Sequence, residues 1–231
     1  MNMRVKQKAS RESRRGFAFS LMELLVTVSI IVILMACTLP VVSKIMARSK
    51  TVQCVGNLKY CGAALSTYIA EQGGVYKNWM AGTQEYAKYW TAYLRWDVGY
   101  SEADLLARRC GLGKFASNIG SHYGFYVEDP HGKKITPVGG ITYYEIRFST
   151  HPNPARAIML GDSMKDDNTQ IHTVRNGSAI GRGGFHTLHD GRANVYFADG
   201  HIESVTPARF RELGVDRIYG ENGQQMVTPQ K

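Results

Sequence analysis

Histidine and aspartate side chains in the second half of the chain are of the types that bind metal ions or transfer protons. His189 is followed by nine residues and then by Asp199-Gly200, and His201 comes directly after this pair. Asp162 and Asp199 each follow a predicted strand, so the two carboxylates could converge if those strands are neighbours. This pattern makes His189, Asp199 and His201 the candidate metal ligands of the chain.

A structural interpretation of the same segment is simpler, and we favour it. Asp199 and Gly200 form a tight turn between two strands, and His201 flanks that hairpin. Asn194 and His189 hydrogen-bond loop backbone. The chain contains no HExxH, GxSxG or paired-carboxylate signature that would favour catalysis. We therefore predict no catalytic residues, no enzyme activity and no cofactor.

The four cysteines are the remaining residues that could react with one another. Cys37 lies in an apolar run and is expected to behave as a small hydrophobic residue. Cys54 and Cys61 lie on one predicted helix, about 10 Å apart along its axis, which is too far for a mutual disulfide. Cys110 could pair with either of them in an oxidising compartment. No CxxC or Cys/His zinc spacing is present.

The basic character of the chain is concentrated at its start. The formal net charge is +9, but residues 1–18 carry six basic groups and one acid, which leaves 22 basic and 18 acidic residues in the remainder, or +4. A basic leader is poor evidence for a nucleic-acid partner, and no RNP, zinc-finger or helix-turn-helix pattern supports one. We therefore expect no nucleic-acid binding.

An apolar run, FSLMELLVTVSIIVILMACTL, occupies residues 19–39 and contains one charge, Glu23. About 20 apolar residues span a bilayer as a helix. The preceding basic residues keep the N-terminus in the cytoplasm and the rest of the chain outside it. The expected location is the inner membrane, with one span and a periplasmic or extracytoplasmic head that could also reach the cell surface or a pilus.

Residues 16–40, GFAFSLMELLVTVSIIVILMACTLP, resemble the N-terminal cleavage and methylation motif of type IV prepilins and pseudopilins. The resemblance implies that a prepilin peptidase cuts between Ala18 and Phe19 and that Phe19 is N-methylated. It also implies a Glu four residues later, here Glu23, and a helix-bending proline, here Pro40. A cut after Gly16 would restore the family's usual glycine but would place Glu23 six residues in, so we favour the cut after Ala18.

Glu23 has a role in this resemblance because a carboxylate inside a membrane is costly unless it is paired. In the family, the Glu is thought to meet the N-terminal amine of a neighbouring subunit during assembly, which would set the register. The alternative is that Glu23 lies near the interface and extends to water. A separate competitor is the segment 34–37, LMAC, which resembles a lipobox in which Cys37 would be lipidated.

The apolar helix is expected to continue to about Gln72 as an amphipathic segment that packs on a globular head. Gly73-Gly74 then ends it. Its apolar or small-residue stripe recurs at spacings of three and four, and the stripe consists of Val55, Leu58, Gly62, Leu65 and Ile69. This gives four regions: a leader at 1–18, a long helix at 19–72, a head at 73–220 and a polar tail at 221–231 that we expect to be disordered.

The head begins with an aromatic-rich segment, residues 75–100, of which Tyr86, Tyr89, Trp90 and Tyr93 have helical spacing. A core role is favoured over a sugar-binding face. Ser101 and Asp104 predict a capped helix ending at Gly111, and Thr206-Pro207 predicts a closing helix ending at Gly214. Five strands are predicted: His122–Val127, Ile141–Phe148, Ala155–Leu160, Asn194–Ala198 and His201–Val205.

The segment from His189 to His201 resembles the H-X9-DG segment of prepilin-like proteins from Planctomycetes- and Lentisphaera-type bacteria, with matches at Asn194, Phe197 and Asp199-Gly200. The two resemblances together imply a pilin-like α+β fold, in which a long N-terminal helix packs on an antiparallel sheet. They imply a structural or minor subunit of a type IV pilus or type II secretion-like assembly, with the membrane, a prepilin peptidase and other subunits as partners. The alternatives are a membrane-anchored module that binds polysaccharide, and an envelope lipoprotein or metal-dependent hydrolase.

Overall fold

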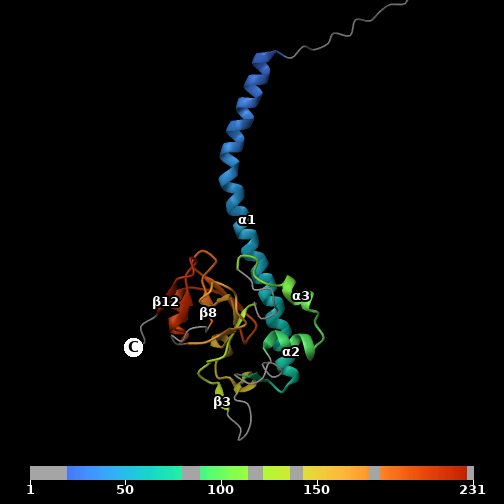
Figure 1. Cartoon of the computed structure of the whole chain (residues 1–231), viewed down its shortest axis with the longest axis vertical. Helices are drawn as coiled ribbons and strands as arrows, with labels where there is room; N and C mark the ends of the chain where they lie inside the picture. Colours follow the sequence, from blue (N-terminus) through green and yellow to red (C-terminus); the bar gives the residue numbers. More distant parts are fainter. Residues whose placement is uncertain (1–19, 80–88, 114–121, 136–142, 177–182, 228–231) are drawn as a thin grey trace, which may run out of the picture. The chain divides into compact units, whose positions relative to one another are not determined.

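The computed structural model describes residues 20–79, 89–113, 122–135, 143–176 and 183–227. The architecture is α+β, as predicted, and the chain divides into two units, residues 1–46 and 47–231 (Figure 1). Helix α1, Leu21–Glu71, runs through both units. The predicted cleavage residues Ala18 and Phe19 and the aromatic Tyr86 lie outside the described residues.

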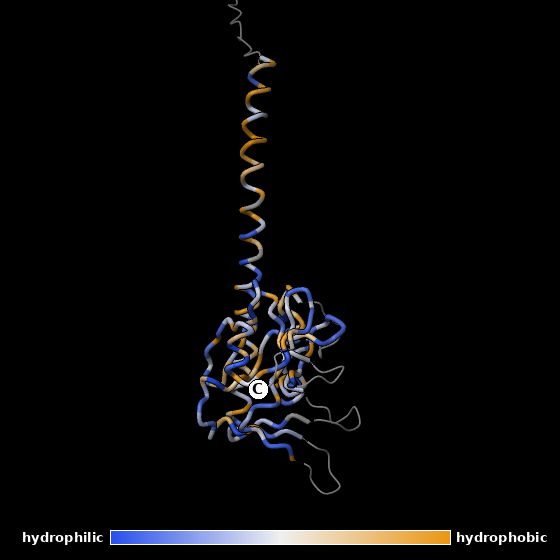
Figure 2. The backbone as a smooth tube through the Cα atoms, turned by 90° about the vertical axis from the view of Figure 1, so that its left-hand side faces the viewer, coloured by the Kyte–Doolittle hydropathy of each residue, from blue (hydrophilic) through white to orange (hydrophobic). Residues whose placement is uncertain are grey.

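The first unit contains the apolar start of α1, and its side chains are exposed along the whole described length. Leu21 is 84% exposed, and even Val26 is 47% exposed. Figure 2 shows the run of apolar residues along this part of the helix. It has a mean hydropathy of 2.7 over 18 residues, and it is the one helix in the described ranges that is long and apolar enough to cross a membrane. A single span is consistent with this result.

In the second unit, residues 47–71 of α1 bury one stripe of their surface. The stripe follows the helical period and consists of Cys54, Leu58, Cys61, Leu65, Tyr68 and Ile69. Gly62 lies beside this stripe, and a Cβ placed there would come within 2.5 Å of the Tyr196 ring. The glycine is therefore needed for the helix to approach the sheet closely. The helix ends at Glu71, where Gly73 and Gly74 both adopt positive φ.

The strands of the second unit form three sheets. The first has the order β1-β4-β3, the second β10-β9-β5-β2-β7, and the third β12-β11-β8-β6. The strands are β1 Val75–Trp79, β2 Gly124–Tyr126, β3 Lys133–Ile135, β4 Tyr143–Arg147, β5 Ile158–Gly161, β6 Ser163–Met164, β7 Thr173–Val174, β8 Gly184–His186, β9 Ala193–Phe197, β10 Ile202–Val205, β11 Arg217–Tyr219 and β12 Gln225–Val227.

The prediction of one antiparallel sheet is thus too simple. β2 pairs with β7 in parallel, and so does β8 with β11, whereas the other pairs of named strands are antiparallel. The predicted strands overlap β2, β4, β5, β9 and β10. The strands that were missed have two to five residues each, too few for an alternating pattern to be recognised.

The five-stranded sheet is buried on both faces because successive side chains of a strand point in opposite directions. Phe125 and Tyr196 belong to the core cluster that includes the buried stripe of α1. Their neighbours Tyr126, Val195 and Phe197 belong to the second cluster. This second cluster includes residues of the four-stranded sheet and of α4, Pro207–Glu212. Alternate side chains of β9 therefore pack into two apolar layers, one on each face of the sheet. The α1 helix covers one of these faces.

The aromatic segment contributes to the core. In α2, Trp90–Trp96, the Trp90 side chain is fully buried and its Nε1 donates to the Tyr123 carbonyl at 2.9 Å. The Tyr93 hydroxyl donates to the Lys77 carbonyl at 2.6 Å. Among the aromatic side chains of α2, Trp96 is exposed, at 58%. These contacts favour the core interpretation of the segment over a sugar-binding face.

Two boundaries differ from the predictions. α3, Glu102–Ala107, is capped by Ser101, whose Oγ accepts from the Asp104 amide, but it ends four residues before Gly111. The tail predicted to be disordered contains β12, which pairs antiparallel with β11. The polar composition of this tail gives no alternating apolar pattern that would predict a strand. The pairing depends instead on a turn at Gly220–Gly223.

Candidate functional site

Cys110 forms a disulfide with Cys54, so the structure selects one of the two pairings that the sequence left open. The bond joins α1 to the loop after α3, with 4.6 Å between the Cα atoms and a sequence separation of 56. Both cysteines are buried. Asn57 Nδ2 donates to the Arg109 carbonyl at 3.1 Å and reinforces the same junction. The disulfide therefore fixes this loop to the buried face of α1.

Cys61 remains a free thiol inside the core, and Cys37 is a free thiol exposed on the first unit. Burial raises the pKa of the Cys61 thiol to about 12, and the nearby Arg108 guanidinium offsets only part of this effect. A thiol with so high a pKa is almost entirely protonated at neutral pH and is a poor nucleophile. Cys61 thus serves packing rather than chemistry.

His189 reaches this disulfide from a tight turn that precedes β9. His189 and Arg192 exchange backbone hydrogen bonds at 3.0 and 3.2 Å, and Asp190 and Gly191 between them both have positive φ. This is the geometry of a two-residue hairpin loop, for which Asp-Gly is a preferred sequence. Local sequence predicts the Asp199-Gly200 turn, and the same dipeptide, Asp190-Gly191, is the signal that marks this second turn.

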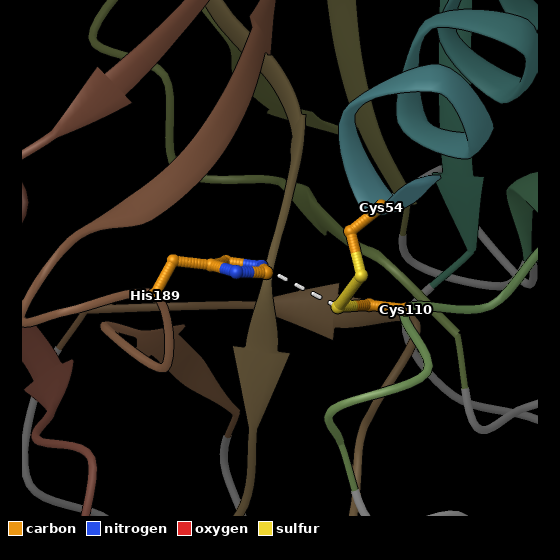
Figure 3. A group of neighbouring side chains, drawn as sticks. All are labelled: Cys54, Cys110 and His189. Carbon is orange, nitrogen blue, oxygen red and sulfur yellow. Dashed lines mark hydrogen bonds between the residues drawn. A yellow bond between two sulfur atoms is a disulfide. The ribbon is translucent and has the colours of Figure 1, made fainter. Parts of the chain in front are cut away.

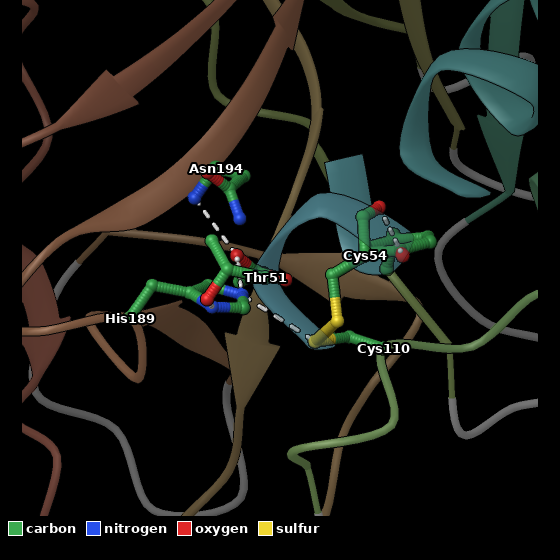
Figure 4. A network of polar contacts seen from close by, with 7 residues as sticks. Thr51, Cys54, Cys110, His189 and Asn194 are labelled. Carbon is green, nitrogen blue, oxygen red and sulfur yellow. Dashed lines mark hydrogen bonds and ion pairs between the residues drawn. A yellow bond between two sulfur atoms is a disulfide. The ribbon is translucent and has the colours of Figure 1, made fainter. Parts of the chain in front are cut away.

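The His189 imidazole makes contacts with three other side chains. Its Nε2 lies 3.1 Å from Asp162 Oδ2. The same nitrogen lies 3.4 Å from Cys110 Sγ (Figures 3 and 4). Its Nδ1 lies 3.1 Å from Thr51 Oγ1, a hydroxyl of α1. A carboxylate and a disulfide sulfur can only accept, so Nε2 carries the proton. In the neutral ring, Nδ1 then accepts from the Thr51 hydroxyl.

Asp162 is fully buried and follows β5 directly. The Asn194 amide donates to Asp162 Oδ2 at 2.8 Å, and the Asp162 amide donates to the Asn194 carbonyl at 3.0 Å. Asp162 Oδ1 and Asn194 Nδ2 are also buried, and neither has a hydrogen-bond partner among the described residues. The result is a buried carboxylate that contacts the His189 ring and has hydrogen-bonding capacity to spare.

Asp162 and Asp199 do not converge, although β5 and β9 are neighbours, and the strand directions explain why. β5 and β9 are antiparallel, with Gly161 opposite Val195 and Ile158 opposite Phe197. The residues that follow the two strands therefore lie at opposite ends of the pair. Asp162 meets the residues before β9, which include His189, and not Asp199 after it.

Asp199 and His201 instead form a separate, partly exposed unit at the β9–β10 turn. Gly200 has a φ of 90°, and Asp199 Oδ1 contacts both the amide and the ring Nδ1 of His201 at 3.2 and 2.5 Å. The His201 ring stacks on Phe197 with 4.4 Å between centroids. Asp199, Gly200 and His201 thus form a hairpin, as the structural interpretation predicted. They do not join His189 in a metal site.

A different set of metal-binding groups comes together in the described part of the chain. Cys54, Cys110 and His189 each offer a ligand atom, and these atoms lie within 4.8 Å of one another. With the sulfurs joined as a disulfide, they cannot act as thiolate ligands. The His189 side chain is 2% exposed and that of Asp162 is not exposed. In this state the cluster is therefore an internal link, closed to substrates.

At the start of α1, Glu23 has a partner within its own chain. The Ser20 amide donates to Glu23 Oε2 at 3.0 Å, and the Glu23 amide donates to Ser20 Oγ at 3.2 Å. This reciprocal pair is a capping box, which satisfies two amides at the start of a helix. The helix continues without interruption through Pro40, the predicted bend.

In comparisons with known proteins, neither a family model, nor a curated protein, nor a solved structure matches this chain.

Proposed function

We propose that the chain is a prepilin- or pseudopilin-like subunit of a type IV pilus or type II secretion-like assembly, with a pilin-like fold. The observation that carries the proposal is α1 itself. Its apolar first part is uncovered within the described chain, and its second part is buried against a folded α+β unit. A subunit that is first held in the membrane and later packs its helix against those of other subunits needs an uncovered apolar segment and a segment anchored to a folded head on the same helix.

The order of events follows from the chemistry of the N-terminus. The head is exported, α1 holds the chain in the inner membrane, and a prepilin peptidase removes residues 1–18. The cut produces an α-ammonium at Phe19, which is then N-methylated. The head serves assembly and partner contacts, and it carries no catalytic group in this proposal.

The capping box refines the role of Glu23. Cleavage before Phe19 leaves the Ser20 amide and hydroxyl in place, so Glu23 can keep both contacts while the subunit is alone in the bilayer. The hydrogen bond from the Ser20 amide lowers the cost of burying the carboxylate but leaves its charge uncompensated. The ammonium of a neighbouring Phe19 would supply that charge during assembly. Glu23 then exchanges a local partner for an intermolecular one.

The experiment is co-expression of the full chain with a prepilin peptidase, followed by membrane fractionation and isolation of sheared filaments. The native chain is expected to shorten and to enter filaments with its partner subunits. Glu23→Ala is expected to stay in the membrane fraction, while Glu71→Ala, at the far end of the same helix, assembles normally. Equal assembly of Glu23→Ala and the native chain would refute the pairing role.

A further inference from the structure

The buried cluster around His189 has ligands and supporting contacts that the disulfide alone does not require. We propose that, when Cys54 and Cys110 are thiols, this cluster binds one thiophilic divalent cation such as Zn²⁺, through Cys54, Cys110, His189 and Asp162. The disulfide and the metal site are then alternative states of the same residues. This inference is independent of the proposed function.

Two of the required spacings are already present. A tetrahedral zinc ion, with bonds of about 2.3 Å to sulfur and about 2.1 Å to nitrogen or oxygen, separates nitrogen from sulfur by about 3.6 Å and nitrogen from oxygen by about 3.4 Å. His189 Nε2 lies 3.4 Å from Cys110 Sγ and 3.1 Å from Asp162 Oδ2. The remaining adjustment is the separation of the two sulfurs to about 3.8 Å, which rotation of two cysteine side chains can provide.

The groups around these ligands are placed as they are in metal sites. A histidine that binds a metal usually donates its other ring N–H to an oxygen. The Thr51 hydroxyl lies 3.1 Å from His189 Nδ1 and can take that role. The Asn194 amide already holds Asp162 Oδ2 at 2.8 Å. The orphaned Asp162 Oδ1, buried with no hydrogen bond among the described residues, indicates a carboxylate with unused capacity.

The protonation changes balance without any further group. Each thiol loses one proton on binding, so two protons are released to solvent. The ring proton of neutral His189 moves from Nε2 to Nδ1, and Nε2 is freed for the metal. The Nδ1–H then donates a hydrogen bond to Thr51 Oγ1. Closing the disulfide instead removes two electrons and two protons from the thiols, and a disulfide-bearing oxidant takes them up and becomes a dithiol.

The test uses the full chain in detergent, with Co²⁺ as the spectroscopic probe and Zn²⁺ for stoichiometry. A phosphine reduces the disulfide: it takes the oxygen of one water and leaves two thiols. The reduced chain is expected to bind one ion, with thiolate-to-cobalt charge-transfer absorption and the visible bands of a tetrahedral site. The same chain left oxidised is expected to show no such absorption. This comparison needs no variant, so it does not depend on whether a mutant folds.

Variants then assign the ligands. His189→Ala is expected to weaken Zn²⁺ binding at least about tenfold, and Thr51→Val by roughly 10–100-fold, as is typical for a supporting contact. His201→Ala and Cys61→Ser serve as matched controls and should bind normally. The proposal is overturned if the reduced native chain shows no thiolate-to-cobalt absorption, or if His189→Ala binds as tightly as the native chain.

Discussion

Asp162 and His189 form a buried pair across the ends of two antiparallel strands, with 3.1 Å between Oδ2 and Nε2. Asp162 directly follows β5, and His189 precedes β9. Through Thr51 and Cys110, the imidazole also contacts α1 and the loop that the disulfide holds against it. His189 thus connects the five-stranded sheet to the long helix α1.

Removal of His189 should therefore destabilise the second unit strongly. In His189→Ala, the buried Asp162 carboxylate keeps the Asn194 amide but loses the His189 ring, and losses of roughly 3–5 kcal/mol are typical when one partner of a buried ion pair is removed. Urea unfolding of the oxidised chain, monitored by tryptophan fluorescence, measures the difference in the free energy of unfolding between the variant and the native chain. His201→Ala is the matched control from the exposed hairpin, and it should change the free energy of unfolding by no more than about 0.5 kcal/mol. Equal effects of the two substitutions would contradict the role assigned to His189.

The disulfide should link Cys54 to Cys110 and should contribute substantially to stability. Non-reducing peptide mapping checks the pairing, and a Cys61–Cys110 peptide would contradict it. Closing a loop of this length stabilises a fold by about 4 kcal/mol in the chain-entropy account. The double variant Cys54→Ser/Cys110→Ser should lose an amount of this order in the absence of metal. Cys37→Ser should leave the stability of the second unit unchanged.

Stability should fall as the pH is lowered, in part because of His122. Burial lowers the pKa of His122 from 6.5 to about 3, and its Nδ1 accepts from the Tyr123 amide. The unfolded chain binds this proton near pH 6.5 and the folded chain does not, so the contribution of neutral His122 is present above pH 6.5 and is lost below it. The slope is roughly 1.4 kcal/mol per pH unit for each such group.

Burial also lowers the pKa of His186, so the native chain should show the combined effect of two groups. Unfolding free energies at pH 7 and pH 5 measure this slope. His122→Gln should make this slope shallower by the contribution of one histidine, even if the variant is less stable than the native chain at both pH values. An unchanged slope would show that His122 is protonated in the folded chain.

Two glycines on α1 offer a matched test of how closely the helix packs on the sheet. Gly62→Ala forces a Cβ to within 2.5 Å of the Tyr196 ring, and overpacking of this kind costs about 1–3 kcal/mol. At Gly56, nothing lies within 4 Å of the added Cβ, so Gly56→Ala should stabilise the helix by about 0.5–1 kcal/mol. Thermal unfolding measures both, and a stabilising Gly62→Ala would contradict the close approach.

The elements with strong local signals were predictable from the sequence. α1 follows from an apolar run joined to a periodic stripe, and the β9–β10 hairpin follows from Asp199-Gly200 between two short strands. The candidate site was not predictable, because its residues meet through strand order. Local patterns give neither the order nor the relative direction of β5 and β9, so they do not decide whether Asp162 lies near Asp199 or near His189.

The cysteine pairing illustrates the same limit. Cys54 and Cys61 both belong to the buried stripe of α1, and helical periodicity does not distinguish them. The choice depends on where the loop after α3 crosses the helix, and Asn57 and Arg109 hold that crossing point one turn from Cys54. Such a long-range contact has no counterpart in local sequence.

Mass spectrometry of the mature N-terminal peptide from native membranes is the decisive measurement of how the N-terminus is processed. We predict a chain that starts at Phe19 and carries one methyl group on its amine. A start at Phe17 would keep the class of protein but move the cut. An uncleaved leader, or a lipidated Cys37 as the first residue, would contradict the assignment.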